Sequence, residues 1–283
     1  MGFQEWIGRQ ETIDDLVTPT PIAALSATLN WPSARPPEGS VLPPLWHWLY
    51  FLPLAQQSEI GEDGHPRRGG FLPPVPLPRR MWAGSTLQFH APLKVGDRIT
   101  RTSTIAEVTE KSGRTGSLVF VKVRHEIRRQ GESAVALTDV HDIVYRDLPQ
   151  PGASAPEPTK APSDAAWEMQ WTPDDVLLFR YSALTFNGHR IHYDRRYVTT
   201  VEGYPGLVVH GPLIATLLLD LVRRRAPSAV VSAFEFRAVR PTFDLNPFSV
   251  CGAPSDDGRS IRLWAKDHEG YLTMSATAHL EAG

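Results

Sequence analysis

Hydrophobic and polar positions alternate in two long stretches of this chain. Residues 85–145 and 233–280 are rich in β-branched and aromatic residues, and short turns such as Gly96-Asp97 and Asp257-Gly258 interrupt them. Each stretch is therefore predicted to fold as an antiparallel meander. The expected strands are 85–90, 98–109, 116–129, 133–145, 233–239, 248–252, 260–266 and 271–280.

Two other segments, residues 41–52 and 209–220, are apolar on nearly every side. This pattern is typical of a helix enclosed by other structure. Upstream of each, Thr12 and Thr172 precede an aspartate by three residues, so both are predicted to be helix N-caps. A helix start, a buried helix and a meander, found twice, predict an α+β fold in which each sheet wraps a central helix.

The two halves meet at residues 150–163, a stretch rich in proline, alanine and serine without periodic pattern. Such a stretch is typical of an exposed linker. We therefore expect an N-terminal module at 1–149 and a C-terminal module at 164–283, each of ordinary domain size. The two modules look like diverged copies of one design.

Composition removes several classes of function. The net charge of −2, with acids and bases mixed, gives no sign of a nucleic-acid partner. The single cysteine, Cys251, excludes an intramolecular disulfide or a multi-cysteine metal site and is predicted to be buried in a strand. The longest apolar run, 41–55, contains three prolines and is shorter than the roughly 20 residues of a membrane span. With no signal peptide at the N-terminus, we expect a cytoplasmic protein without a membrane partner.

The densest group of polar side chains lies at residues 181–194, which read Tyr-Ser-Ala-Leu-Thr-Phe-Asn-Gly-His-Arg-Ile-His-Tyr-Asp. The apolar segment that follows opens with His210-Gly211-Pro212. Polar groups this dense beside a predicted buried helix indicate a site. The spacing His-x-x-His-x-Asp matches no zinc pattern, so no metal is expected. Asp194 is expected to cap a helix or to pair with Arg190 or Arg195.

Residues 181–192 resemble the motif of the MaoC-like hydratases and dehydratases of the hotdog superfamily, aromatic-x-x-Leu-[Ser/Thr]-Gly-Asp-x-Asn-Pro-[aliphatic]-His. They match it at the aromatic, leucine, threonine, aliphatic and histidine positions, and Val208-Val-His-Gly211 matches the motif downstream. The resemblance implies a double hotdog that covers most of the chain. It also implies that the C-terminal half carries the catalytic motif and that the N-terminal half widens the substrate groove.

Two positions depart from this motif. The family's catalytic aspartate falls on Asn187 and its asparagine falls on His189, and an amide cannot act as a general base. The block 185–194, together with Arg79-Arg-Met-Trp-Ala-Gly84, nevertheless resembles one branch of the superfamily. This branch contains the mitochondrial 3-hydroxyacyl-thioester dehydratases and the mesaconyl-C4-CoA and itaconyl-CoA hydratases. The departures therefore look like a feature of the branch.

The resemblance and the chemistry of hydration together give the expected roles. Water addition to an unsaturated thioester needs a base, an acid and a donor to the thioester oxygen. We expect His192 to be the principal acid and base, Asn187 to hold the water, and the N–H of Gly211 to stabilise the oxyanion. A structural role remains the alternative for His192 and Asn187. The expected substrate-binding residues are His189, Arg190, His210, Arg80, Trp82, Arg237 and Arg240.

These roles predict a hydro-lyase that needs no cofactor and hydrates itaconyl-CoA or mesaconyl-C4-CoA to citramalyl-CoA. An arginine or His189 would bind the free carboxylate of such an acyl group, and the rigid apolar segment 71–78 could form a wall of its pocket. One alternative is dehydration of (R)-3-hydroxyacyl thioesters in lipid synthesis. Another is a non-catalytic acyl-thioester-binding protein. Because hotdog proteins often pair their sheets edge to edge, we expect a homodimer.

Overall fold

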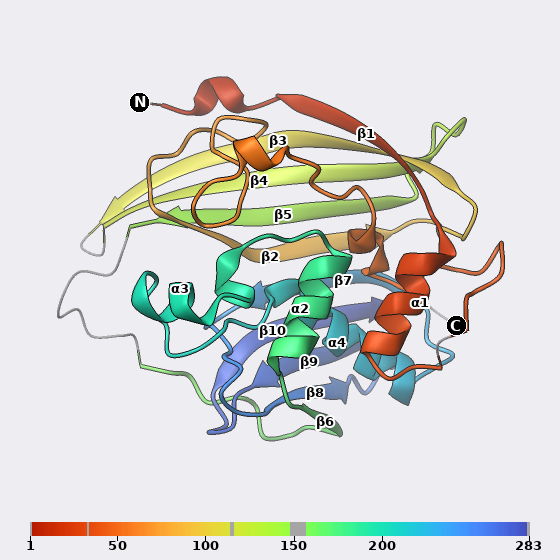
Figure 1. Ribbon diagram of the computed structural model, residues 1–283. Helices are drawn as coiled ribbons and strands as arrows, with labels where there is room; N and C mark the ends of the chain where they lie inside the picture. Colours follow the sequence, from red (N-terminus) through yellow and green to blue (C-terminus); the bar gives the residue numbers. More distant parts are fainter. Residues whose placement is uncertain (1, 33, 114–115, 148–156, 282–283) are drawn as a thin grey trace.

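The computed structural model describes residues 2–32, 34–113, 116–147 and 157–281. Within these ranges, one curved antiparallel sheet surrounds the helices on its inner side (Figure 1). Its strands are β1 (Gln10–Leu16), β2 (Arg79–Phe89), β3 (Arg98–Gly113), β4 (Gly116–Arg129), β5 (Leu137–Arg146), β6 (Trp167–Trp171), β7 (Val231–Ala238), β8 (Phe248–Pro254), β9 (Ser260–Lys266) and β10 (Leu272–Leu280). Their order across the sheet is β1-β3-β4-β5-β2-β7-β10-β9-β8-β6.

The two halves of the chain join through the pairing of β2 with β7, which we call the seam. Strands of the N-terminal half lie on one side of the seam and strands of the C-terminal half lie on the other. Gly84 lies opposite Arg237 there, and a Cβ atom on Gly84 would come within 2.3 Å of the carbonyl oxygen of Phe236. Only glycine permits the two strands to approach so closely at this point.

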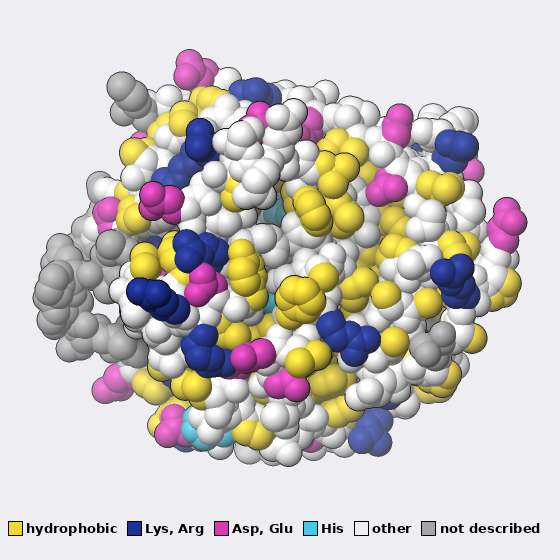
Figure 2. Space-filling model, in the orientation of Figure 1, with side chains coloured by type: hydrophobic (Ala, Val, Ile, Leu, Met, Phe, Trp, Pro, Cys, Tyr) yellow, Lys and Arg dark blue, Asp and Glu magenta, His cyan; other side chains and the backbone are white. Residues whose placement is uncertain are grey.

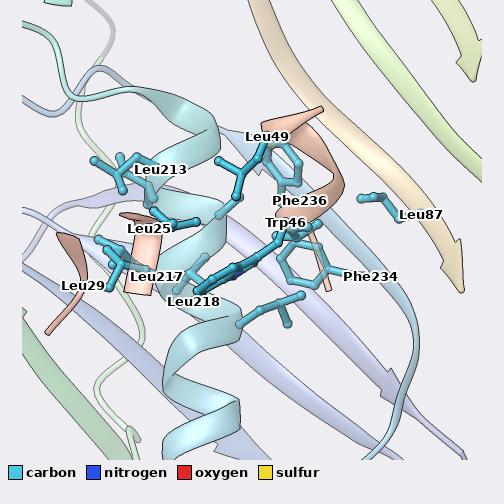
Figure 3. Packing of buried hydrophobic residues seen from close by; sticks show 14 of the residues in the cluster. Leu25, Leu29, Trp46, Leu49, Leu87, Leu213, Leu217, Leu218, Phe234 and Phe236 are labelled. Carbon is cyan, nitrogen blue, oxygen red and sulfur yellow. The ribbon is translucent and has the colours of Figure 1, made fainter. Parts of the chain in front are cut away.

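The helices are α1 (Pro19–Thr28), α2 (Asp175–Leu184), α3 (Arg195–Thr200) and α4 (Gly211–Arg225). Helix α4 is the centre of the core, and all its residues from 213 to 222 are buried. Figure 3 shows Leu213, Leu217 and Leu218 of α4 packed among side chains of α1, the chain near Trp46 and strand β7. Each leucine buried in this way stabilises the fold by about 1.5–3 kcal/mol.

Among the described residues of the N-terminal half there is no counterpart of α4, and the helix predicted at residues 41–52 is wrong. This segment is buried as expected, but it contains only the short 3-10 turn η2 (Trp46–Leu49). Two prolines inside it and a third directly after it lack the N–H that a helix needs. Leu45 and Phe51 also have φ angles of 69° and 55°, outside the helical region. Irregular chain, rich in proline up to residue 78, therefore covers this half of the sheet.

Both predicted helix caps are also corrected. Thr12 lies in β1, which pairs with β3 along its whole length, so the first helix starts later in the chain. In the second half the cap is Asp174, whose carboxylate accepts a hydrogen bond of 2.7 Å from the N–H of Leu177. Thr172 lies outside the helix, because the carboxylate of Asp174 is the group that accepts a hydrogen bond from the first turn.

The eight predicted strands are all present with shifted ends, and the largest difference is in β2, which begins six residues earlier than predicted. Strands β1 and β6, at the two edges of the sheet, were not predicted. Cys251 is a buried free cysteine in β8, as predicted. No helix in the described ranges is long and apolar enough to cross a membrane. The first half of the predicted linker, 150–156, lies outside the described residues, and in the second half Lys160 forms a β-bridge with Tyr271. The module boundaries stay a prediction.

Replacement of Gly84 by alanine should weaken the seam. The added Cβ would meet the carbonyl oxygen of Phe236, so β2 and β7 must move apart. We expect the free energy of unfolding, measured by urea titration, to fall by about 1–3 kcal/mol. Gly70→Ala is the matched control, because no atom lies within 4 Å of its added Cβ. Equal stability of the two variants would contradict the importance of this contact.

Candidate active site

A cavity of about 1610 Å³ lies between the two halves of the chain. Its lining comes from the polar loop, defined here as residues 185–194, from the start of α4, and from the inner faces of β2 and β5. Figure 2 shows a hollow in this face of the molecule, rimmed by hydrophobic side chains, with histidine atoms visible inside. The cavity thus contains parts of both halves, with His192, Asn187 and Gly211 among its lining residues.

His192 is held with one ring nitrogen available to the cavity. Its Nδ1 donates a hydrogen bond of 2.7 Å to the carbonyl oxygen of Val208, which leaves Nε2 with a lone pair. The side chain is only 8% exposed, and burial lowers its pKa to about 4. His192 is therefore a neutral base at pH 7.

His210 packs against the ring of His192. Its ring stacks on that of His192, with the centroids 3.7 Å apart and the planes at 16°. Its Nε2 forms a hydrogen bond of 2.8 Å with Oγ of Ser182, and burial holds its pKa well below the ordinary value. His210 is not among the residues that line the cavity, so the structure gives it a supporting position rather than the predicted contact with substrate.

Gly211 is the first residue of α4, where unpaired N–H groups give a helix its positive end. A Cβ at this position would meet only the terminal methyl of Met274, at 4.0 Å. The cavity is therefore open beside the backbone of Gly211, as a site for an oxyanion requires.

Asn187 closes the turn of the polar loop. Its Oδ1 accepts a hydrogen bond of 3.0 Å from the N–H of His189, an arrangement common for asparagine in turns. The preceding residue, Phe186, has a φ angle of 50°, so the chain bends sharply between α2 and this turn. One lone pair of this oxygen is therefore engaged in the turn, and the NH₂ group of Asn187 keeps both of its donors for a ligand.

Two predicted substrate-binding arginines lie away from the cavity. Arg190 pairs with Asp194 at 2.7 Å and donates to the carbonyl oxygen of Glu62. Asp194 also caps α3, so this pair holds the loop together, as the structural alternative predicted. Arg237 is exposed because the alternation along β7 places its neighbour Phe236 on the inner face. Neither arginine lines the cavity.

Three other predicted residues do line it: Arg80, Trp82 and Arg240. Arg240 pairs with Asp267 at 3.1 Å. Trp82 stacks on the ring of His141, with centroids 4.0 Å apart. The predicted apolar wall is also present, because residues 71–73 border the same space.

Sequence patterns did not indicate the N-terminal loop 61–65, which packs on the polar loop. The N–H of Arg190 donates to the carbonyl oxygen of Asp63, and a Cβ on Gly64 would overlap the backbone of Gly188. This loop places His65 with its ring centroid 4.0 Å from that of His189. No pattern could have found it, because the stretch Gly-Glu-Asp-Gly-His has no periodicity and carries no sign of what it contacts.

Asp63, His65 and His189 bring one possible metal-ligand atom each within 4.8 Å of one another. The hydrogen bond of 3.1 Å between Asp63 Oδ2 and Nδ1 of His65 accounts for much of this proximity. It also occupies two of the three groups, so the arrangement serves a hydrogen-bonded pair better than a cation. If a metal bound in this site, Asp63, His65 and His189 would be its candidate ligands.

A second group of polar residues lies on the inner face of the N-terminal half. Asp139, 1% exposed, accepts hydrogen bonds at Oδ2 from His47, Trp48 and His141 at 3.2, 2.9 and 2.8 Å. Burial opposes its ionisation, but the charge and hydrogen bond of His141 and the bond from His47 hold its pKa well below the ordinary value. Polar residues at alternate, inward positions of β5 were a usable signal for this group that the sequence reasoning missed.

Comparison with known proteins identifies relatives across the whole chain. The family model for hydroxyacyl-thioester dehydratase type 2 matches residues 45–244. Mesaconyl-C4-CoA hydratase of Chloroflexus aurantiacus is 48% identical over 281 residues, which cover 98% of each chain. A solved MaoC-like dehydratase has a TM-score of 0.72 and 12% identity, with all of both chains covered.

A Mycobacterium tuberculosis protein described as having a double hotdog fold has a TM-score of 0.57 and 14% identity, covering 97% of this chain and 96% of its own. These structural likenesses confirm the predicted double hotdog as the fold of this chain. In the part of the chain that the structure describes, the long central helix is found in the C-terminal half alone.

The imidazole of His192 should remain neutral between pH 5.5 and 8, with its proton on Nδ1. Burial keeps the ring neutral by lowering its pKa to about 4, and the hydrogen bond to Val208 places the proton on Nδ1. Nitrogen-15 NMR of labelled protein, assigned with a His192→Gln variant, measures the tautomer and the pKa directly. Protein unfolded in urea is the control, where histidine titrates near about 6.5. A midpoint near that value in the folded protein would contradict the assignment.

Proposed function

The chain belongs to the hydroxyacyl-thioester dehydratase type 2 family and is a hydro-lyase, and from this premise we propose that it hydrates a short unsaturated dicarboxylic acyl-CoA. The substrates we propose are itaconyl-CoA or mesaconyl-C4-CoA, and the product is citramalyl-CoA. The observation that carries this proposal is the 48% identity to a mesaconyl-C4-CoA hydratase over 98% of both chains. The site supplies a mechanism that fits it.

In this mechanism, which applies to mesaconyl-C4-CoA because its double bond is conjugated with the thioester, His192 first acts as the base. Its Nε2 takes a proton from a water molecule, and the hydroxide forms a bond to the β-carbon of the thioester. Electrons of the carbon–carbon double bond move onto the thioester oxygen, where the N–H of Gly211 and the positive end of α4 stabilise the charge. His192, now protonated, returns the proton to the α-carbon. One imidazole therefore serves both steps, and the NH₂ group of Asn187 is left to orient the water.

This mechanism is compatible with Asn187 at the position of the family's catalytic aspartate. The imidazoles of His192 and His210 are buried and neutral, so a fixed carboxylate is not needed to set their protonation. Dehydration of a 3-hydroxyacyl thioester, the alternative that the family description favours, would use the same groups in reverse. Polar lining residues such as Arg80 and His189 fit a dicarboxylic acyl group better than a long apolar chain.

We further propose that the protein is a cytoplasmic homodimer. Strands β1 and β6 form the two edges of the sheet, and an edge strand offers unpaired backbone groups to a second copy. Light scattering during size-exclusion chromatography measures the assembly, and a mass near 31.5 kDa would contradict the dimer.

A hydration assay tests the proposed substrates. Purified protein is mixed with mesaconyl-C4-CoA, itaconyl-CoA or crotonyl-CoA, and thioester products are separated and quantified. We expect a kcat/KM for one dicarboxylic substrate at least about 100-fold above that for crotonyl-CoA, equivalent to about 2.7 kcal/mol of additional transition-state stabilisation. A preference for crotonyl-CoA would favour the lipid dehydratase. Binding without turnover of any substrate would favour the non-catalytic alternative.

His192→Ala should lower kcat by about 10²–10⁴-fold, the usual contribution of a general acid and base. His279→Ala is the matched control, because His279 is exposed on β10. Asn187→Asp tests the amide separately. If its NH₂ group holds the water, the aspartate should also lower kcat, whereas a gain in activity would show that the amide only replaces a missing base.

A further inference from the structure

Arg80 is a cation of the cavity wall without an acidic partner. It lies on β2, is half-buried and lines the cavity beside the polar loop. Among the residues that the structure describes, no carboxylate lies within 4.0 Å of its guanidinium, whereas the adjacent Arg79 pairs with Glu202. A partly buried guanidinium without a counter-ion is unfavourable unless a ligand supplies one.

Two histidines share the surroundings of Arg80. Burial is the main cause that lowers the pKa of His65 and of His189, and the positive charge of Arg80 adds to it in both. His65 is oriented by Asp63, whose carboxylate accepts a hydrogen bond from its Nδ1–H. The Nε2 of the neutral ring carries a lone pair, so His65 donates to a carboxylate there only by taking up a proton as the anion binds. His65 and His189 both line the cavity.

The local charge favours an anion. Arg68 also lowers the pKa of His65, so two guanidinium groups act on this imidazole and one carboxylate, Asp63, opposes them. Asp63 is already engaged by the N–H and the ring of His65. Arg80 itself lines the cavity, and its planar guanidinium is suited to a carboxylate.

We propose that Arg80, His65 and His189 form the subsite that binds the free carboxylate of the acyl group. This inference rests on the proposed function and names the residues that select its substrate class. Arg80 and His65 come from the N-terminal half, so the subsite exists only because loop 61–65 and β2 meet the polar loop.

The position of the subsite agrees with the chemistry. In itaconyl-CoA and mesaconyl-C4-CoA the free carboxylate is attached to the carbon that receives the water. A group that binds it must therefore adjoin the base, and the ring of His189 lies edge to face with that of His192, 5.4 Å between centroids. Crotonyl-CoA carries only a methyl group there and gains nothing from a cation.

The polar group around Asp139 is the competing location, and its charge excludes it. Asp139 is ionised, buried and already accepts three hydrogen bonds at Oδ2, while its Oδ1 has no partner. An unpaired carboxylate oxygen attracts a donor and repels a second carboxylate. This group therefore cannot be the place where an anionic acyl end binds.

The test compares substrates with and without the carboxylate. In Arg80→Met we expect kcat/KM for mesaconyl-C4-CoA to fall by at least about 100-fold relative to that for crotonyl-CoA, the effect of losing a charge-assisted bidentate pair. His65→Asn should shift the same ratio by about tenfold. Arg146→Met removes another arginine from the cavity wall and should leave the ratio within about threefold of wild type.

A neutral substrate makes the test independent of whether a variant folds. Mesaconyl-C4-CoA with its free carboxylate converted to a methyl ester should be a poor substrate of the wild type, and Arg80→Met should not worsen it further. If the wild type hydrates the ester as well as the acid, or if Arg80→Met lowers turnover of all substrates equally, the subsite is wrong. If the wild type hydrates no dicarboxylic substrate at all, the proposed function itself fails instead.

Discussion

The ladder between β2 and β7 is the interaction on which the rest of this molecule depends. It turns two sheets into one and sets the inner face of the N-terminal half beside the motif of the C-terminal half. The cavity, with lining residues from both halves, follows from this junction. Gly84 permits a close approach in this ladder, because a Cβ atom there would meet the carbonyl oxygen of Phe236.

Burial determines the protonation state of the histidines in the site. His192, His189 and His210 are all held neutral because water cannot reach them freely, and their rings pack on one another. Neutral imidazoles do not need a carboxylate as a counter-ion, which agrees with an asparagine at position 187. The two charges that matter, Arg80 and Asp139, lie in different parts of the same cavity, so one end of it attracts anions and the other does not.

Sequence reasoning recovered what local patterns encode and missed what distant contacts decide. The strands, the central helix α4 and the loop with His192 all follow from periodicity and a contiguous motif. The helix expected at 41–52 failed because apolar composition outweighed the prolines in that prediction. His65 could not be found, since its neighbour His189 lies 124 positions further along the chain. Asp139 was within reach, as a polar residue at an inward strand position.

The irregular chain that replaces a central helix in the N-terminal half also has a thermodynamic consequence. Residues 71–78 contain four prolines, and this chain borders the cavity at residues 71–73. Proline has few conformations to lose, so a wall built from it is already ordered before a ligand arrives. Binding then costs conformational entropy mainly in the ligand. Because this wall does not rearrange, it favours small acyl groups whose shape already fits it.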